Sequence, residues 1–222
     1  MARILIPSEG PKSWQRLLAQ PYKQWVKGFS ARTIAHAWEA SDSMPDEVAE
    51  ILGTAFGMFD LLMAIPEHKT TLPGGSRDSQ SDVFALIRHE TGLATCTIEG
   101  KVDEPFGPIV AEWLEDASPG KKQRLEYICQ LLGLKEVPAG VHYQLLHRTA
   151  SALVEADRLH ANDAAMIVHS FSPEQRWFDA YERFCTVLGC SAEVGRPAVI
   201  TVPSGKRLVV GWACGEQRYR AI

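Results

Sequence analysis

Residues 82–101 read DVFALIRHETGLATCTIEGK and decide the fold, because two apolar runs here flank a short polar turn. The runs 83–87 and 93–98 have the length and the apolar character of buried β-strands. Residues 90–92, Glu-Thr-Gly, supply the residue types of a tight turn. The stretch therefore predicts an antiparallel β-hairpin. Its open end carries the charged residues Asp82, Glu99 and Lys101.

The pairing of the two strands follows from the position of the turn. If the turn is centred between Glu90 and Thr91, counting outward along both strands pairs Asp82 with Glu99. Directly paired residues point to one face, with Cβ atoms roughly 5 Å apart. Side-chain alternation places Lys101 on that face too. A shift of one residue would separate the two acids, so the prediction depends on the turn.

Two neighbouring carboxylates and a lysine suggest a metal site. The carboxylates repel each other, and one of them would take up a proton unless a cation is bound between them. Hard oxygen ligands with open water positions suit Mg²⁺ or Mn²⁺. We therefore expect Asp82 and Glu99 to bind the metal and Lys101 to stabilise the charge that develops during phosphodiester hydrolysis. The alternative is a solvated surface or a simple salt bridge.

The same residues resemble the PD-(D/E)xK nuclease superfamily. Asp82 matches the acid that opens the second core strand, and Glu99-Gly100-Lys101 matches the E-x-K motif. Ser81 stands where the name-giving proline would be, at a position that varies in the superfamily. The resemblance implies an α/β fold with a restriction-endonuclease-like mixed β-sheet flanked by helices, and a magnesium-dependent nuclease activity on DNA or RNA.

A closer resemblance is to a bacterial family within that superfamily, and it implies no particular substrate. Its marks are spread over residues 65–171 and are Ile65-Pro66-Glu67-His68-Lys69, Pro73-Gly74-Gly75-Ser76-Arg77, the stretch 99–107, Tyr143-Gln144-Leu145-Leu146-His147-Arg148 and His169-Ser170-Phe171.

The rest of the chain predicts helices around this hairpin. We expect an N-terminal helical segment over residues 1–57, packed on an α/β core over residues 58–222 to form one compact domain. Capping residues and apolar spacing place the elements of the core. The expected strands are 61–65, 83–87, 93–98, 164–169, 198–202 and 207–214, and the expected helices are 109–115, 121–132, 143–160 and 173–188.

Further polar residues are candidates for a supporting or substrate-binding role, namely Glu39, Glu67, Arg77, Gln144, Arg148 and His169. Gln144 and Arg148 lie one helical turn apart and suit a phosphate or the carboxylates. The plainer interpretations are an exposed helix glutamate for Glu39 and a structural histidine for His169. Glu67 either reaches the site or pairs with Lys69.

Composition restricts the partners and the setting. The 222 residues carry a formal net charge of −4, so the overall charge does not indicate a nucleic-acid binder. Five cysteines without a C-x-x-C pair argue against disulfides and zinc. Residues 1–7 are too short for a signal peptide and no apolar run spans a membrane, which predicts a cytoplasmic protein. A non-catalytic nucleic-acid- or protein-binding module, or a defence or toxin component, remains an alternative; the sequence predicts no oligomeric state.

Overall fold

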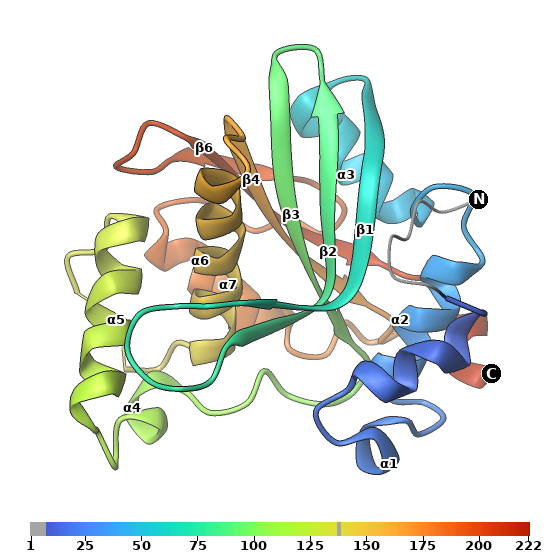
Figure 1. Ribbon diagram of the computed structural model, residues 1–222, viewed down its shortest axis with the longest axis horizontal. Coiled ribbons are helices and arrows are strands. Elements are labelled where there is room, and N and C mark those ends of the chain that lie inside the picture. The colour runs from blue at the N-terminus through green and yellow to red at the C-terminus, as the bar shows by residue number, and fades with distance from the viewer. Residues whose placement is uncertain (1–7, 137–138) are drawn as a thin grey trace.

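A computed structural model describes residues 8–136 and 139–222 and shows a mixed β-sheet between two layers of helices (Figure 1). The expected α/β class is confirmed. Residues 1–7, on which the signal-peptide argument rested, lie outside the described residues. Within the described ranges, no helix is long and apolar enough to cross a membrane.

The sheet has six strands in the order β1-β2-β3-β4-β6-β5. β3 pairs with β4, and β4 with β6, in parallel, whereas the other neighbours are antiparallel. The parallel pairs need crossovers, which helices supply. The strands are β1 (Phe59–Thr70), β2 (Ser79–His89), β3 (Gly92–Lys101), β4 (Asp163–Ser170), β5 (Ala198–Thr201) and β6 (Arg207–Cys214).

Helices cover both faces of the sheet (Figure 1). The N-terminal segment supplies one layer and the helices after β3 supply the other. The first layer contains η1 (Pro11–Leu17), α1 (Pro21–Gln24), α2 (Ser30–Glu39) and α3 (Asp46–Phe56). The second contains α4 (Val110–Trp113), α5 (Pro119–Leu132), α6 (Tyr143–Arg158) and α7 (Phe178–Val187), and η2 (Gln217–Ala221) follows β6.

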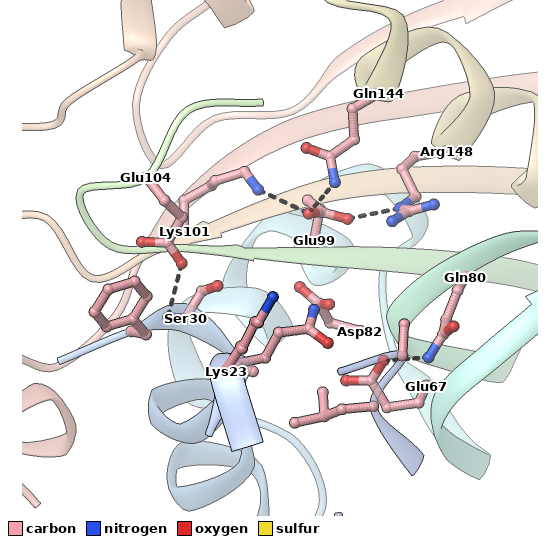
Figure 2. A pocket seen from close by; sticks show the side chains of 15 residues that line it. Lys23, Ser30, Glu67, Gln80, Asp82, Glu99, Lys101, Glu104, Gln144 and Arg148 are labelled. Carbon is pink, nitrogen blue, oxygen red and sulfur yellow. Dashed lines mark hydrogen bonds and ion pairs between the residues drawn. The ribbon is translucent and has the colours of Figure 1, made fainter. Parts of the chain in front are cut away.

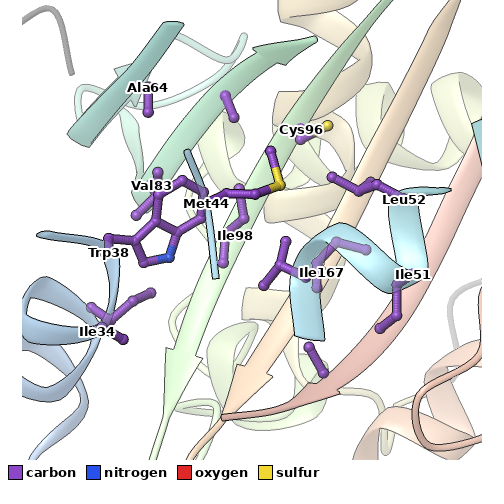
Figure 3. Close-up of a cluster of buried hydrophobic side chains, with 14 of the residues drawn as sticks. Ile34, Trp38, Met44, Ile51, Leu52, Ala64, Val83, Cys96, Ile98 and Ile167 are labelled. Carbon is purple, nitrogen blue, oxygen red and sulfur yellow. The ribbon is translucent and has the colours of Figure 1, made fainter. Parts of the chain in front are cut away.

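The central strands are apolar on both sides because each side meets a helical layer. On β4, Ile167 packs with α2 and α3, while its neighbours Met166 and Val168 pack with α5 to α7. Figure 3 shows the first of these clusters, where Trp38 of α2 lies over the sheet and is fully buried. This packing fixes α2 and α6 on opposite faces of β3, the strand that carries the candidate site.

The predicted hairpin register is confirmed. Pairs run from His89↔Gly92 next to the turn to Val83↔Ile98. Continuing this register places Asp82 beside Glu99. Both strands are longer than the apolar runs, because the polar residues at their ends also pair.

Beyond Asp82 the β1–β2 pair leaves β3 and bends toward α5, as Figure 1 shows. Pairing of β1 with β2 continues to Thr70↔Ser79, where β2 no longer pairs with β3. The connecting loop 71–78 is held by Arg124 of α5. Its guanidinium donates to the carbonyl oxygens of Leu72, Pro73, Gly75 and Arg77 at 2.7 to 3.3 Å.

The expected start of the last helix is wrong. The last helix begins at Phe178 rather than at residue 173. Gln175 and Trp177 adopt positive φ angles of 52° and 71°, and a helix cannot pass through that conformation. The first helix of the N-terminal segment, Pro11 to Leu17, is a 3-10 helix.

Candidate functional site

Three carboxylates stand in a row on three neighbouring strands where the β1–β2 pair bends. Glu67 lies between the paired positions Pro66↔Val83 and His68↔Ser81, which places it beside Asp82. Glu99 is the next residue in the row, on β3. All three line one cavity of about 360 Å³, together with Lys101 and residues of the N-terminal segment (Figure 2).

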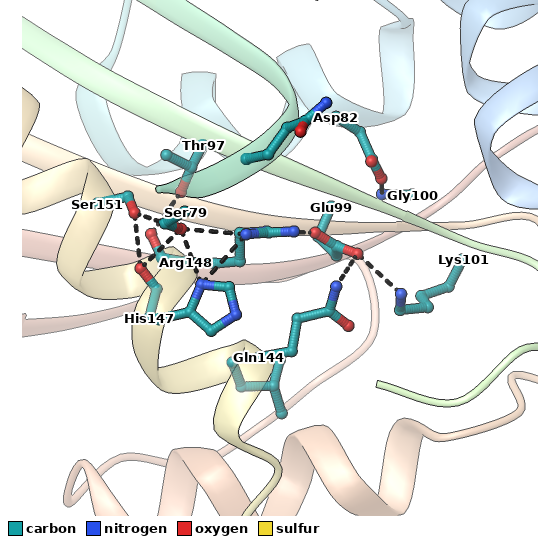
Figure 4. A network of polar contacts seen from close by, with 12 residues as sticks. Ser79, Asp82, Thr97, Glu99, Gly100, Lys101, Gln144, His147, Arg148 and Ser151 are labelled. Carbon is teal, nitrogen blue, oxygen red and sulfur yellow. Dashed lines mark hydrogen bonds and ion pairs between the residues drawn. The ribbon is translucent and has the colours of Figure 1, made fainter. Parts of the chain in front are cut away.

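Glu99 is the most tightly held of the three (Figure 4). Its Oε1 accepts hydrogen bonds from Lys101 Nζ at 2.8 Å and from Gln144 Nε2 at 2.7 Å. Its Oε2 accepts one from Arg148 Nε at 2.6 Å. A hydrogen bond fixes helix α6 next to Glu99, since Thr97 Oγ1 of β3 donates to the carbonyl of Arg148 at 3.0 Å. Glu99, Lys101 and Arg148 are all less than a tenth exposed.

The Asp82 carboxylate turns to the backbone of β3 rather than to Glu99. Its Oδ2 accepts a hydrogen bond from the Gly100 N–H at 2.6 Å, and Figure 4 shows it apart from Glu99. A Cβ on Gly100 would lie 3.2 Å from this oxygen and 3.1 Å from Ile34 of α2. Glycine therefore gives room both to the carboxylate and to the helix. The two acids are neighbours on one face of the sheet, as the register predicts, and each carboxylate has its own donors.

Glu67 enters the site through an unusual backbone. Its φ of 53° lies in the left-handed region, which non-glycine residues rarely adopt and which costs about 1 kcal/mol or more. Its Oε2 accepts a hydrogen bond from Gln80 Nε2 at 2.8 Å. The side chain is nine-tenths buried in the cavity wall. Residues in such conformations cluster at functional sites, which supports Glu67 as a member of this one.

The electrostatics divide the three carboxylates into two kinds. Desolvation and the nearby Glu99 charge raise the pKa of Asp82 to about 7. Desolvation, followed by the charge of Asp82, raises the pKa of Glu67 well above its ordinary value. Desolvation also opposes the ionisation of Glu99, but Lys101 and Arg148 outweigh it and lower the pKa of that carboxyl. Glu99 is thus a fixed anion, whereas burial dominates at Asp82 and Glu67 and favours their neutral forms.

The raised pKa of Asp82 predicts how stability depends on pH. The folded state holds this proton more tightly than the unfolded chain, whose aspartate titrates near pH 4. Asp82 therefore contributes stability below about pH 4 that is lost as pH rises through about 7. Asp82→Asn, which resembles the protonated form, should flatten this dependence and stabilise the protein at pH 8 by on the order of 2 kcal/mol. Urea unfolding at pH 5 and pH 8 measures both effects.

Asp60→Asn is the control for this experiment. Asp60 is an exposed aspartate that pairs with Arg88 on the surface, so its replacement should change both unfolding curves equally and little. If Asp82→Asn lowered the free energy of unfolding at pH 8, instead of raising it, the argument would be contradicted. That result would mean that the fold needs the charged carboxylate.

The donor set fits a divalent cation in part. In the ranges 8–136 and 139–222, no group of three or more His, Cys, Asp or Glu side chains is arranged as a metal cluster. However, Glu67 and Asp82 each have one carboxylate oxygen for which no hydrogen bond is found among the described residues. Both line the cavity, and burial together with neighbouring carboxylate charge raises the pKa of both, an effect that a bound cation would oppose. Hard oxygen donors of this kind suit Mg²⁺ or Mn²⁺.

Three of the six further candidates lie elsewhere. Glu39 accepts hydrogen bonds from Trp14 Nε1 at 2.7 Å and from Ser8 Oγ, so it ties η1 to α2. His169 is fully buried on the α2–α3 face, with its Nε2 2.6 Å from Glu47 Oε1. Arg77 is exposed in the 71–78 loop and lines a different pocket. Glu67, Gln144 and Arg148 do line the cavity.

The sequence interpretation missed several residues that line the cavity, namely Lys23, Gln24, Phe29 and Gln80. Gln80 had a signal, because it lies two residues before Asp82 on the same strand. Glu104 accepts a hydrogen bond from the Ser30 N–H at 2.8 Å and so holds the start of α2. Nothing in the local sequence indicates that Lys23 and Phe29 reach the site.

Comparison with known proteins identifies the family and no activity. No curated protein and no solved structure matches the chain. One family model matches residues 7–217, nearly the full length. Its description is a domain of unknown function, DUF6946. By this match, the chain belongs to the DUF6946 family.

Proposed function

We propose that the protein is a divalent-metal-dependent nuclease that hydrolyses phosphodiester bonds of DNA or RNA. The observation that carries the proposal is the row Glu67, Asp82 and Glu99 beside Lys101 in one cavity. Two of these acids have raised pKa values, because burial and neighbouring carboxylates outweigh the cations Lys101 and Arg148, so a further positive charge between them would be favourable. The similarity of Asp82 and Glu99-Gly100-Lys101 to the PD-(D/E)xK motif agrees with this assignment.

Each residue then has a defined task. Glu67 and Asp82 would hold Mg²⁺ or Mn²⁺, and Glu99 would join them through the oxygens now shared with Gln144 and Arg148. A divalent cation supplies Lewis acidity at a phosphoryl oxygen and lowers the pKa of a water molecule. Lys101 uses one of its three N–H donors on Glu99, which leaves the others for the charge that develops on the phosphate.

The N-terminal segment supports a nucleic-acid substrate although the whole chain is acidic. Residues 10–38 contain five lysines and arginines and no acidic residue. This segment forms one wall of the cavity, through residues such as Lys23 and Phe29. Tyr22 is 91% exposed and Phe29 is 47% exposed. Cations beside exposed aromatic rings suit phosphates and unpaired bases. We assign the activity to the cytoplasm, where the five free thiols would remain reduced.

A non-catalytic binding module is the second candidate. The observation that favours it is the complete occupation of Glu99, whose two oxygens accept three hydrogen bonds from side chains. A metal would have to displace or share these contacts. Such a protein would bind oligonucleotides through the 10–38 segment and bind no metal.

The test measures metal binding and cleavage separately. Calorimetric titration with Mn²⁺ at pH 6.5 should show binding with release of protons, because Glu67 and Asp82 must ionise to act as ligands. Comparing buffers of different ionisation enthalpy counts those protons. Asp82→Asn and Glu67→Gln should lose the binding. Lys101→Met should keep the metal but cleave labelled DNA or RNA about 100-fold more slowly or worse, since it acts on the transition state.

Asp60→Asn serves again as the control and should bind Mn²⁺ like the wild type. Oligonucleotide binding without metal binding would support the binding module and exclude the nuclease. Absence of both would contradict both candidates. Cleavage at the wild-type rate by Lys101→Met would remove Lys101 from the mechanism.

A further inference from the structure

A second pocket lies on the other side of Arg148. It has a volume of about 400 Å³ and is formed by the 71–78 loop, the start of α5 and the first turns of α6. Residues four apart on a helix lie above one another, so α6 presents two parallel rows. Gln144 and Arg148 line the carboxylate cavity, whereas Tyr143 and His147 line this second pocket.

The charge of the second pocket is opposite to that of the first. Its lining includes Arg77, Lys121 and Arg124, against the single carboxylate of Asp78. The guanidinium of Arg124 donates its hydrogen bonds to backbone carbonyls, but its positive charge still acts on the pocket. Lys121 Nζ donates to the Trp113 carbonyl at 2.7 Å and has two further N–H groups. For the Arg77 side chain, no partner is found in the part of the chain that the structure describes.

Tyr143 places a buried hydroxyl without a normal hydrogen bond at the wall of this pocket. The residue is 8% exposed, and its buried hydroxyl lies near the Arg124 guanidinium but has no hydrogen bond of normal geometry among the described residues. A buried hydroxyl left in this state costs stability, because the hydrogen bond that it makes to water in the unfolded chain is lost. Its ring is stacked on Trp113 with centroids 3.8 Å apart, which fixes the direction of the hydroxyl. A polar ligand in the pocket would remove this cost.

His147 offers another donor. Arg148 Nη1 donates to its Nδ1 at 3.1 Å, so Nδ1 accepts and the proton of the neutral ring is on Nε2. Burial and the charges of Arg148, Arg124 and Lys101 keep the pKa of His147 well below its ordinary value, which makes the neutral ring the normal form. Nε2 has no acceptor within residues 8–136 and 139–222.

We propose that this pocket binds a phosphate monoester group, either free phosphate or the terminal phosphate of a nucleic-acid strand. The hydroxyl of Tyr143, the Nε2–H of His147 and the cations Arg77 and Lys121 supply donors and charge for its oxygens. The strand-end form rests on the proposed nuclease function, whereas the binding of phosphate itself does not. A strand bound with its end here would extend past Arg148 toward the carboxylates.

The test titrates the full chain with inorganic phosphate by calorimetry, in the absence of metal. The wild type should bind, and Tyr143→Phe and Arg77→Ala should each weaken binding about tenfold, the loss of one hydrogen bond or charge contact. The matched controls are Tyr127→Phe and Lys122→Ala on α5. They change the same groups outside the lining of this pocket, so they should bind like the wild type.

Oligonucleotides with 5′-phosphate, 3′-phosphate or hydroxyl ends distinguish the two sources. Tighter binding of one phosphorylated end, lost in Tyr143→Phe, assigns the pocket to strand ends; equal binding of all ends with retained binding of inorganic phosphate assigns it to free phosphate. Failure of inorganic phosphate to bind, or equal binding by all variants and controls, overturns the proposal. Asp82→Asn should bind phosphate normally, so a failure of the nuclease assignment would be seen separately.

Discussion

Glu99→Ala is expected to destabilise the protein by about 3–5 kcal/mol, because it leaves buried cations without their counter-ion. Lys101 is 4% exposed and Arg148 is 8% exposed, and both donate to this carboxylate. A domain of this kind has a total stability of about 5–15 kcal/mol, so the loss should be visible at once in urea unfolding at pH 7. We also expect no metal binding and no cleavage from this variant.

A double variant separates the charge effect from simple loss of contacts. Adding Lys101→Met to Glu99→Ala removes one of the stranded cations, so the double variant should be more stable than Glu99→Ala alone. Glu126→Ala, an exposed position on α5, should cost less than about 0.5 kcal/mol. If Glu99→Ala costs no more than Glu126→Ala, solvent in the cavity already compensates the cations and the network does not organise the fold.

Arg124→Ala is expected to cost about 3–4 kcal/mol. This is less than the sum of four hydrogen bonds from a charged donor, at about 1.5–3 kcal/mol each, because most of the freed loop carbonyls can bond to water instead. The side chain holds four carbonyl oxygens of the 71–78 loop and is 9% exposed. A Cβ on Gly74 would lie 2.3 Å from the Gly120 carbonyl, which shows how closely this loop meets α5. Hydrogen exchange of residues 71–79 should become faster in the variant, together with a lower urea midpoint.

The comparison with Arg124→Lys tests whether geometry or charge matters. A lysine offers a single point charge and cannot reach four oxygens in different directions. We expect Arg124→Lys to be nearly as unstable as Arg124→Ala, whereas Lys122→Ala next to it should change little. Full rescue by lysine would show that the loop needs only a positive charge beneath it.

The hairpin could be predicted from sequence because its signals are local. A turn at 90–92 between two apolar runs fixes the register, and the register puts Asp82 beside Glu99. The direction of the Asp82 side chain could not be predicted, because it depends on the Gly100 N–H and on the approach of Ile34 from α2. Sequence patterns report which face a residue occupies, not which donor it meets.

Distant partners explain why two candidates from the sequence lie outside the cavity, and His169 is the structural histidine of the plainer interpretation. His169 is bound to Glu47 and Glu39 to Trp14, and neither pairing leaves a trace in the local sequence. Arg148 was a candidate because it interrupts an apolar helix stripe, a local feature that marks a buried polar contact. Glu67 was a candidate because it lies on the strand next to the hairpin, but its left-handed backbone has no sequence signature.

The irregularities of β1 also bear on how the protein avoids aggregation. β1 is an edge strand, and a regular free edge offers another chain a row of backbone donors and acceptors. Here the row is broken three times, by the register shift between Leu61 and Met63, by Pro66, which has no N–H, and by the left-handed Glu67. The distortion that carries Glu67 into the site thus also deprives an incoming strand of a template for amyloid-like growth.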